Sequence, residues 1–148
     1  MLIRRTVVLA VVFAGAAVAG LSMLNAAGSA GPEVENSSWV LEELNGEALP
    51  ALPEGAGRTP GIQFGEDGQF SATAGCNMMN GTAEISGASI TFPEPMATTM
   101  MACPPPLDEL EQSMTAGLGE AAELRLEDGR MLLLNGAGAV VMGFRAAE

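Results

Sequence analysis

The sequence predicts a mainly β protein: a small antiparallel β-barrel-like domain with one amphipathic helix covering an opening. Two observations carry this prediction, namely closely spaced turn signals between segments of alternating character and a single stretch with helical period. Hairpin-type pairs that end in glycine begin at Asn45, Asp67, Asn80, Ser86, Asp128 and Asn135. About eight short strands and one helix leave no long bare sheet edge if the sheet curls into a small barrel.

Alternation of apolar and polar residues commits one face of each expected strand to the core. The apolar residues on these faces are Ile62 and Phe64; Phe70, Ala72 and Ala74; Ile90 and Phe92; Leu124 and Leu126; Met131 and Leu133; and Val140, Met142 and Phe144. Between Pro50 and Pro60 the residues follow no period, which predicts an exposed loop.

The helix is expected over residues 106–118, directly after a run of three prolines whose fixed φ suits a helix start. Its apolar residues recur at helical intervals, at Leu107, Leu110, Met114, Leu118 and Ala121. The carboxylates of Asp108, Glu109 and Glu111 fall in the first turns, where the helix dipole favours negative charge.

The first 30 residues have the pattern of a secretory signal peptide, with Arg4 and Arg5 before a nearly continuous apolar run from Val7 to Leu24 and small residues after it. We expect cleavage between Ala27 and Gly31, and hence an exported protein of the periplasm or cell envelope. The alternative is an uncleaved membrane anchor, because the run has a length at the lower edge of a bilayer span. Residues 31–37 are expected to form a tether and residues 38–146 the domain.

The chain is strongly acidic. Its net charge is −12, and removal of residues 1–30, which carry two arginines and no carboxylate, makes it −14. Such a chain is repelled by nucleic acid and by anionic lipid, so neither is an expected partner, and a membrane contact is expected only through a retained N-terminal segment. Histidine and lysine are both absent, which removes the commonest general base.

No catalytic residue and no cofactor are predicted. Four serines, at positions 71, 86, 89 and 113, are available as nucleophiles, but the chain offers no ordinary group to activate them. Carboxylate pairs such as Glu42 with Glu43, or Asp108 with Glu111, leave a carboxylate-dependent hydrolase as the alternative. Adjacent carboxylates are expected by chance in so acidic a sequence, so a non-enzymatic binding or structural module is the preferred interpretation.

Cys76 and Cys103 are the only cysteines, so any covalent bond inside the chain joins them. In an exported protein a structural disulfide is favoured over a reactive thiol or a metal pair. It closes a loop of about 28 residues, worth roughly 3.5 kcal/mol in the chain-entropy model. Asn77 and the Asn80-Gly81 pair tolerate positive φ, and we expect tight turns there.

Five methionines crowd the two cysteine segments, at positions 78, 79, 96, 100 and 101. Thioethers are soft ligands suited to copper(I), which makes a soft-metal binder a second alternative. Methionine also fills irregular cores, and a sequence with 4% aromatic residues needs flexible apolar volume. Packing is therefore the preferred interpretation, and no metal site is predicted.

Several segments resemble the META/HslJ domain family in order and spacing. They are Trp39 to Gly46, Ile62 to Gly68, Gly75-Cys76-Asn77, Met96 to Cys103 and Leu107 to Glu111, so the resemblance covers about Ser38 to Phe144. The motif residues are Trp39, Gly75, Cys76, Asn77, Gly81, Thr98, Met101 and Cys103. Where many members carry arginine, this chain has Met78 and Thr99.

The resemblance implies a compact, β-rich barrel in which the two cysteine segments lie together. It also implies a bacterial envelope setting connected with stress response and with motility or secretion, without a settled biochemical activity. The expected partner is an unknown envelope protein or a small apolar ligand. For a protein partner we expect contacts on Asp108, Glu109 and Glu111 and on the loop from Leu49 to Pro60.

Overall fold

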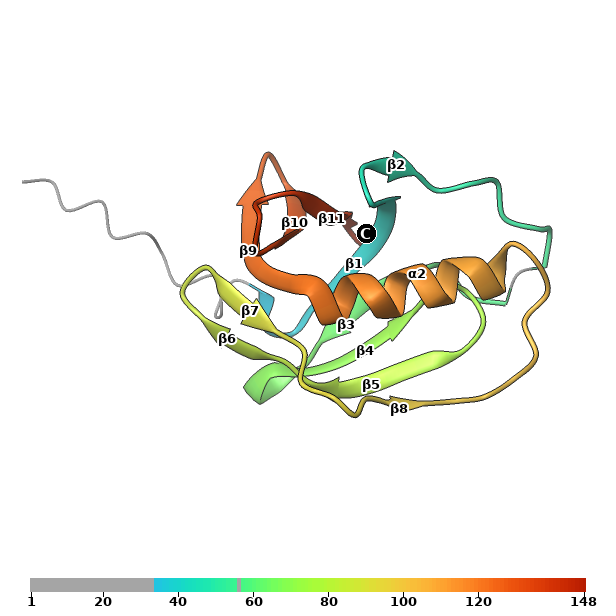
Figure 1. Ribbon diagram of the computed structural model, residues 1–148, viewed down its shortest axis with the longest axis horizontal. Helices are drawn as coiled ribbons and strands as arrows, with labels where there is room; N and C mark the ends of the chain where they lie inside the picture. Colours follow the sequence, from blue (N-terminus) through green and yellow to red (C-terminus); the bar gives the residue numbers. More distant parts are fainter. Residues whose placement is uncertain (1–33, 56) are drawn as a thin grey trace, which may run out of the picture.

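The computed structural model describes residues 34–55 and 57–148, which form one curled antiparallel sheet and a long helix (Figure 1). The strands are β1 (Ser37–Leu44), β2 (Glu47–Ala48), β3 (Gly61–Phe64), β4 (Gln69–Thr73), β5 (Met78–Thr82), β6 (Glu84–Ser86), β7 (Ser89–Thr91), β8 (Ala97–Thr98), β9 (Ala121–Glu127), β10 (Arg130–Asn135) and β11 (Val140–Ala146). A short 3₁₀ turn, η1 (Glu66–Gly68), precedes β4, and the helix is α2 (Leu107–Glu120).

The strands follow the order β6-β7-β9-β10-β11-β1-β3-β4-β5-β8, and β2 pairs with β1. In the centre of this order β1 pairs with β11 on one side and with β3 on the other. A bulge between Leu41 and Glu43 interrupts the β1–β11 register, and bulges increase the local bend of a strand. The sheet thus curls into a half-barrel, which confirms the predicted fold class.

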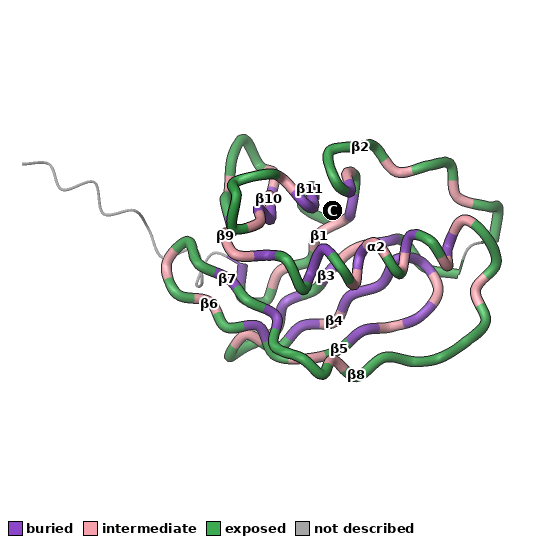
Figure 2. Tube along the Cα trace, viewed as in Figure 1, coloured by how far each residue is buried: buried purple, intermediate pink, exposed green. Residues whose placement is uncertain are grey.

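Helix α2 lies across the open side of the curled sheet (Figure 1). Its buried side chains are Leu107, Leu110, Met114 and Leu118, the helical-period residues named above. Figure 2 shows the buried residues gathered along this side of α2 and along β3 to β5. Burying an aliphatic side chain of this size contributes about 1.5–3 kcal/mol, so this stripe holds the helix on the sheet. The helix ends at Glu120, and Ala121 begins β9 without a connecting loop.

The beginning of the domain differs from the expected tether over residues 31–37. Val34 is completely buried in the core, and β1 already begins at Ser37, whose hydroxyl donates to the Val34 carbonyl. A single apolar residue in a polar stretch gives no periodic signal, which is why sequence analysis missed it. The expected signal peptide, residues 1–30, lies outside the described residues.

The expected turn at Asn80-Gly81 is wrong, because β5 runs through both residues. Asn80 pairs with Ser71 and Gly81 with Phe70 of β4. A Cβ on Gly81 would lie 2.9 Å from Cε1 of Phe70. Glycine is needed at this position to make room for the aromatic ring rather than to turn the chain.

The long loop from Leu49 to Pro60 has no regular secondary structure in its described residues, as predicted. Leu49 and Leu52 are half-buried against the core, and the carbonyl of buried Pro60 accepts a hydrogen bond from the Leu41 amide at 2.9 Å. The loop is therefore attached at both ends, while its centre is exposed. Within residues 34–55 and 57–148, no helix has both the length and the apolar character needed to cross a membrane.

Candidate functional site

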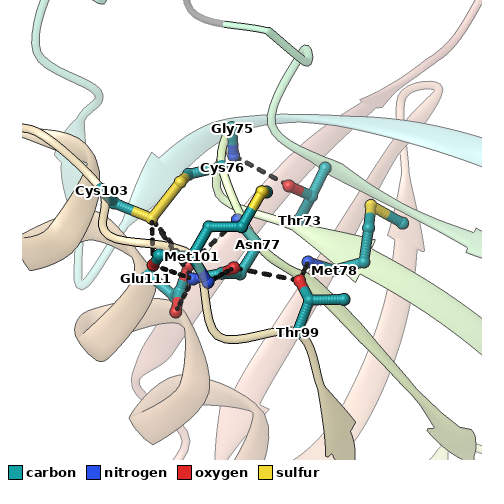
Figure 3. The surroundings of a disulfide bond; sticks show 9 residues. All are labelled: Thr73, Gly75, Cys76, Asn77, Met78, Thr99, Met101, Cys103 and Glu111. Atoms are coloured by element: carbon teal, nitrogen blue, oxygen red, sulfur yellow. Dashed lines mark hydrogen bonds between the residues drawn. A yellow bond between two sulfur atoms is a disulfide. The ribbon is translucent and has the colours of Figure 1, made fainter.

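The Cys76–Cys103 disulfide joins the connection between β4 and β5 to the segment that leads from β8 into α2 (Figure 3). The S–S distance is 2.07 Å and the Cα atoms are 6.0 Å apart. The predicted disulfide is therefore confirmed. It lies directly beside a polar cluster that sequence analysis did not foresee.

Asn77 is the centre of this cluster, and only 3% of the residue is exposed. Its Oδ1 accepts hydrogen bonds from the Met101 amide at 2.7 Å and from the Thr99 hydroxyl at 3.0 Å. Its Nδ2 donates to the Met101 carbonyl at 3.1 Å and approaches Cys103 Sγ at 3.3 Å. The side chain amide thus holds the segment around the second cysteine as a peptide backbone would.

Helix α2 contributes Glu111 to the same cluster (Figure 3). The carboxylate accepts from the Asn77 backbone amide at 3.2 Å and from Asn77 Nδ2 at 3.0 Å. Hydrogen bonds to a charged acceptor are the stronger kind, worth about 1.5–3 kcal/mol each. Sequence analysis expected Asn77 to allow a tight turn; instead, one buried amide joins three segments that are distant in the sequence.

Gly75 makes the approach of these segments possible. It has φ +119°, a conformation that side chains rarely adopt, and its amide donates to the Thr73 hydroxyl at 3.0 Å. A Cβ at this position would lie 3.0 Å from Cδ2 of Leu107 and 3.4 Å from the Arg58 carbonyl oxygen. The start of α2 and the end of the long loop therefore both pack against a residue without a side chain.

The remaining motif residues are divided between this cluster and the sheet. Met101 lies in the cluster through its backbone, whereas Thr98 is exposed in β8 opposite Met79. Trp39 lies in β1, half-buried, and its indole N–H donates to the Ser37 hydroxyl at 2.7 Å. At the two positions where many family members carry arginine, Met78 and Thr99 contact each other: the Met78 amide donates to the Thr99 hydroxyl at 2.9 Å, and the Thr99 amide donates to the Met78 carbonyl at 3.0 Å.

A groove of about 590 Å³ opens beside the disulfide, between the long loop and the start of α2. Its lining includes Arg58 from the loop and Cys76, Met101, Pro104 and Leu107 from the disulfide side. Among the described residues, the exposed large apolar side chains are Met100 and Met101, with exposed fractions of 94% and 56%. Both belong to the segment that Asn77 holds in place.

The three carboxylates expected to form one partner surface have different environments. Glu109 is exposed, but Asp108 and Glu111 are half-buried, and Glu111 uses its carboxylate inside the protein. Asp108 Oδ1 is buried without a hydrogen-bond partner among the described residues. The helix thus presents Glu109 to solvent, and Glu111 belongs to the polar cluster.

The second carboxylate pair, Glu42 with Glu43, is neutralised by arginines on the outer face of the sheet. Arg145 Nε lies 3.3 Å from Glu42, and Arg130 Nη2 lies 3.1 Å from Glu43. Gly143 leaves room for the latter pair, since a Cβ there would lie 2.8 Å from Arg130 Nη2. On the same face, the hydrogen bond and the charge of Glu123 raise the pKa of Arg125. These carboxylates form ion pairs rather than an acid–base pair.

The methionines do not form one ligand set. Met78 and Met79 are neighbours in β5, so their side chains point to opposite faces of the sheet. Met79 is completely buried and its sulfur accepts a hydrogen bond from the Thr115 hydroxyl at 3.3 Å. Met100, by contrast, is almost fully exposed. Within the described residues, no group of three or more cysteines and carboxylates has a metal-binding arrangement either.

A half-barrel with one covering helix, tied by a disulfide and a buried asparagine, defines a class of small β-rich domain. The META domain family model matches residues 32–148, and the chain belongs to this family. Heat shock protein HslJ of Escherichia coli (strain K12) is 28% identical over 101 residues, which cover 68% of this chain and 69% of that protein.

Two solved structures share the fold. One NMR structure, 25% identical in sequence, covers 77% of this chain and 92% of its own chain with a TM-score of 0.60. The NMR structure of a protein from Burkholderia xenovorans, 20% identical, covers 80% of this chain and 86% of its own chain with a TM-score of 0.61. The family expected from the motif residues is therefore confirmed.

Proposed function

We propose that this protein is an exported, non-enzymatic binding module of the bacterial cell envelope, with a role in stress response or in secretion or motility. The signal-like pattern of residues 1–30 supports export. The disulfide supports it independently, because such bonds form and persist in oxidising compartments. The role in the envelope rests on membership of the META domain family.

The observation that carries the binding role is the exposure of two consecutive methionines near the disulfide: Met101 lines the groove, and Met100 precedes it in the same segment. Flexible, polarisable methionine side chains are well suited to adaptable contact surfaces. Here the disulfide and the Asn77 hydrogen bonds hold their backbone, so the exposed side chains cost little ordering on binding. This arrangement fits a protein partner better than an apolar ligand inside the half-barrel, where the core side chains pack together.

Charge adds a second property of the partner. Because the mature chain has a net charge of −14, its partner is expected to present a basic patch around the apolar contact. The association of the two should then weaken as the salt concentration rises. The only described arginine that lines the groove is Arg58, which shares it with Glu54. The groove itself is thus close to neutral, and the attraction comes from the acidic surroundings.

The test is site-specific photocrosslinking in intact cells. A benzophenone amino acid replaces Met100, and a matched control replaces Ala137, which is also solvent-exposed, in the turn between β10 and β11. We expect a defined crosslinked protein at position 100 that is absent at position 137 and is reduced by Met101→Ser. Equal products at both positions, or none at position 100, would contradict binding at this groove.

The non-enzymatic part needs its own test. A panel of glycoside and phosphoester substrates should show no turnover by the purified protein. Turnover that disappears on Glu42→Gln/Glu43→Gln or on Asp108→Asn would replace the proposal with a carboxylate-dependent hydrolase. These residues are chosen because Glu111 is part of the structural cluster and its substitution would also lower the stability of the domain.

A further inference from the structure

The methionines of the described chain lie in sharply different environments. Met100 and Met101 are consecutive in the sequence and have exposed fractions of 94% and 56%. Met78 and Met96 are half-buried, and the remaining four are completely buried, at Met79, Met114, Met131 and Met142. An oxidant that arrives from solvent therefore meets the two thioethers of one short segment first.

The segment that carries these two side chains connects β8 to α2, and its residues 99–104 form neither helix nor strand. Its backbone is nevertheless fixed. The Met101 amide donates to Asn77 Oδ1 at 2.7 Å, and the Met101 carbonyl accepts from Asn77 Nδ2 at 3.1 Å (Figure 3). Since both thioethers lie outside the hydrophobic core, a chemical change on them leaves the fold intact.

Met101 also lines the groove beside the disulfide, where Pro104 and Leu107 are further apolar lining residues. Oxidation to methionine sulfoxide converts a flexible apolar side chain into a polar one. A partner that packs an apolar group against Met101 would then bury the sulfoxide oxygen without a hydrogen-bond donor, which is unfavourable. The oxidation state of this one sulfur therefore controls the character of the groove wall.

The charge of the chain favours one kind of oxidant. Removal of residues 1–30 gives a net charge of −14, and the described groove lining includes the carboxylate of Glu54. Anionic oxidants are repelled by such a surface, whereas neutral peroxides and hypohalous acids approach it without an electrostatic penalty. Transfer of one oxygen atom from an oxidant of this class gives methionine sulfoxide, which is reversible.

We propose that Met100 and Met101 form a reversible oxidation site for neutral peroxides and hypohalous acids, and that oxidation of Met101 weakens binding of a partner at the groove. The first half of this inference depends on the exposure of the two side chains alone. The second half rests on the proposed function, because it concerns the same groove.

With hydrogen peroxide the reaction is a balanced transfer of one oxygen atom. A lone pair of the thioether sulfur attacks one peroxide oxygen, the S–O bond forms, and the O–O bond breaks. The hydroxide that leaves takes up the proton of the transferred hydroxyl group and becomes water. The sulfur loses two electrons and the peroxide gains them. A methionine sulfoxide reductase reverses the change: two thiols become a disulfide, and the oxygen leaves as water.

The first experiment treats the purified mature chain, with its disulfide intact, with rising amounts of hydrogen peroxide or hypochlorous acid. Peptide mapping by mass spectrometry locates each added oxygen atom, a gain of about 16 Da per sulfoxide. We expect the gain at Met100 and Met101 before the half-buried Met78 and Met96, with the four buried methionines unchanged. Methionine sulfoxide reductases A and B together should remove it, and thermal unfolding should stay native-like throughout.

The second experiment measures binding. The purified domain carries a benzophenone amino acid at position 100, is oxidised, is freed of oxidant and is then titrated into solubilised envelope fraction before irradiation. Oxidation should raise the apparent Kd for the crosslinked partner about five- to hundredfold, the effect of burying a polar atom without a partner. Met101→Leu, which keeps the apolar volume but cannot be oxidised, should abolish this difference. The matched control, Met96→Leu, should retain it.

The oxidation site is overturned if Met100 and Met101 gain oxygen no faster than Met78 and Met96, or if the reductases fail to remove it. Control of binding is overturned if oxidation leaves the apparent Kd unchanged, or if Met101→Leu weakens as much on oxidation as the unsubstituted chain. A domain that crosslinks nothing before oxidation contradicts the proposed function and the control of binding with it. The order of oxidation and its reversal then still decide whether the oxidation site exists.

Discussion

The carboxylate of Glu111 accepts two hydrogen bonds from a single residue, Asn77: one from its backbone amide at 3.2 Å and one from its Nδ2 at 3.0 Å. These residues are 34 positions apart in the sequence. The contact ties the start of α2 to the connection between β4 and β5, next to the disulfide that ties the same connection to the segment before α2. One wall of the groove is thus held by a covalent bond and by hydrogen bonds together.

Asn77→Ala should lower the free energy of unfolding by about 2–4 kcal/mol, because Thr99, Met101 and Glu111 all lose hydrogen bonds to the buried amide at once. Urea denaturation monitored by circular dichroism measures the change. The matched control is Asn135→Ala, a half-buried asparagine at the end of β10 that also accepts two backbone hydrogen bonds, from the exposed residues Ala137 and Ala139, and it should cost less. Equal losses in both variants would show that the Asn77 cluster has no special structural role.

The three carboxylates of α2 should respond differently to substitution. Glu111→Ser removes the acceptor for Asn77 and should cost about 1–3 kcal/mol, whereas Glu109→Ser at an exposed position should stay within about 0.5 kcal/mol. Thermal unfolding of the single variants gives the comparison. If Glu109→Ser abolishes crosslinking to a partner without loss of stability, the exposed helix face also contributes to binding; unchanged crosslinking would leave only the groove.

The native protein should contain no free thiol. Replacement of both Cys76 and Cys103 by serine should cost about 2–5 kcal/mol, the usual loss for a native bridge in a small secreted domain. Thiol titration under denaturing, non-reducing conditions checks the first statement, and urea denaturation checks the second. Two titratable thiols in protein recovered from its native compartment would contradict both the bond and the proposed export.

Gly81→Ala should destabilise the domain by about 1–3 kcal/mol through overpacking, since the new methyl group would meet the Phe70 ring at 2.9 Å. Gly136→Ala is the control, because a Cβ there meets nothing within 4 Å and the residue does not have a positive φ. Differential scanning calorimetry of the two variants measures the difference. If both variants behave like the unmodified protein, β5 has more freedom next to Phe70 than the contact implies.

Intact-mass measurement of protein recovered from cells should place the mature N-terminus between Ala27 and Gly31. A mass that includes Met1 would change the interpretation to a membrane-anchored domain. Val34 supplies a boundary for this prediction, because it is completely buried in the core. Cleavage beyond Val34 would remove a core side chain, so a mature form that begins later should be measurably less stable.

The sequence by itself determined many of the core residues, the helix and most of the strands. Alternation identified the buried faces of β3, β4 and β11, and the helical interval of Leu107, Leu110, Met114 and Leu118 located α2, because local backbone geometry repeats with a fixed period. The disulfide pairing followed from the sequence as well, because a chain with only two cysteines allows a single pairing.

Only the tertiary structure decided the roles of Asn77, Gly81 and Glu111. An asparagine and a glycine after a cysteine suggest turns, yet both are explained by contacts with residues distant in the sequence: Asn77 with Met101 and Glu111, and Gly81 with the Phe70 ring. Likewise, nothing in the local pattern separates Glu111 from its exposed neighbour Glu109. Periodicity reports which way a side chain points, but the partner that it meets is set by the packing of separate segments, and that packing places the candidate groove.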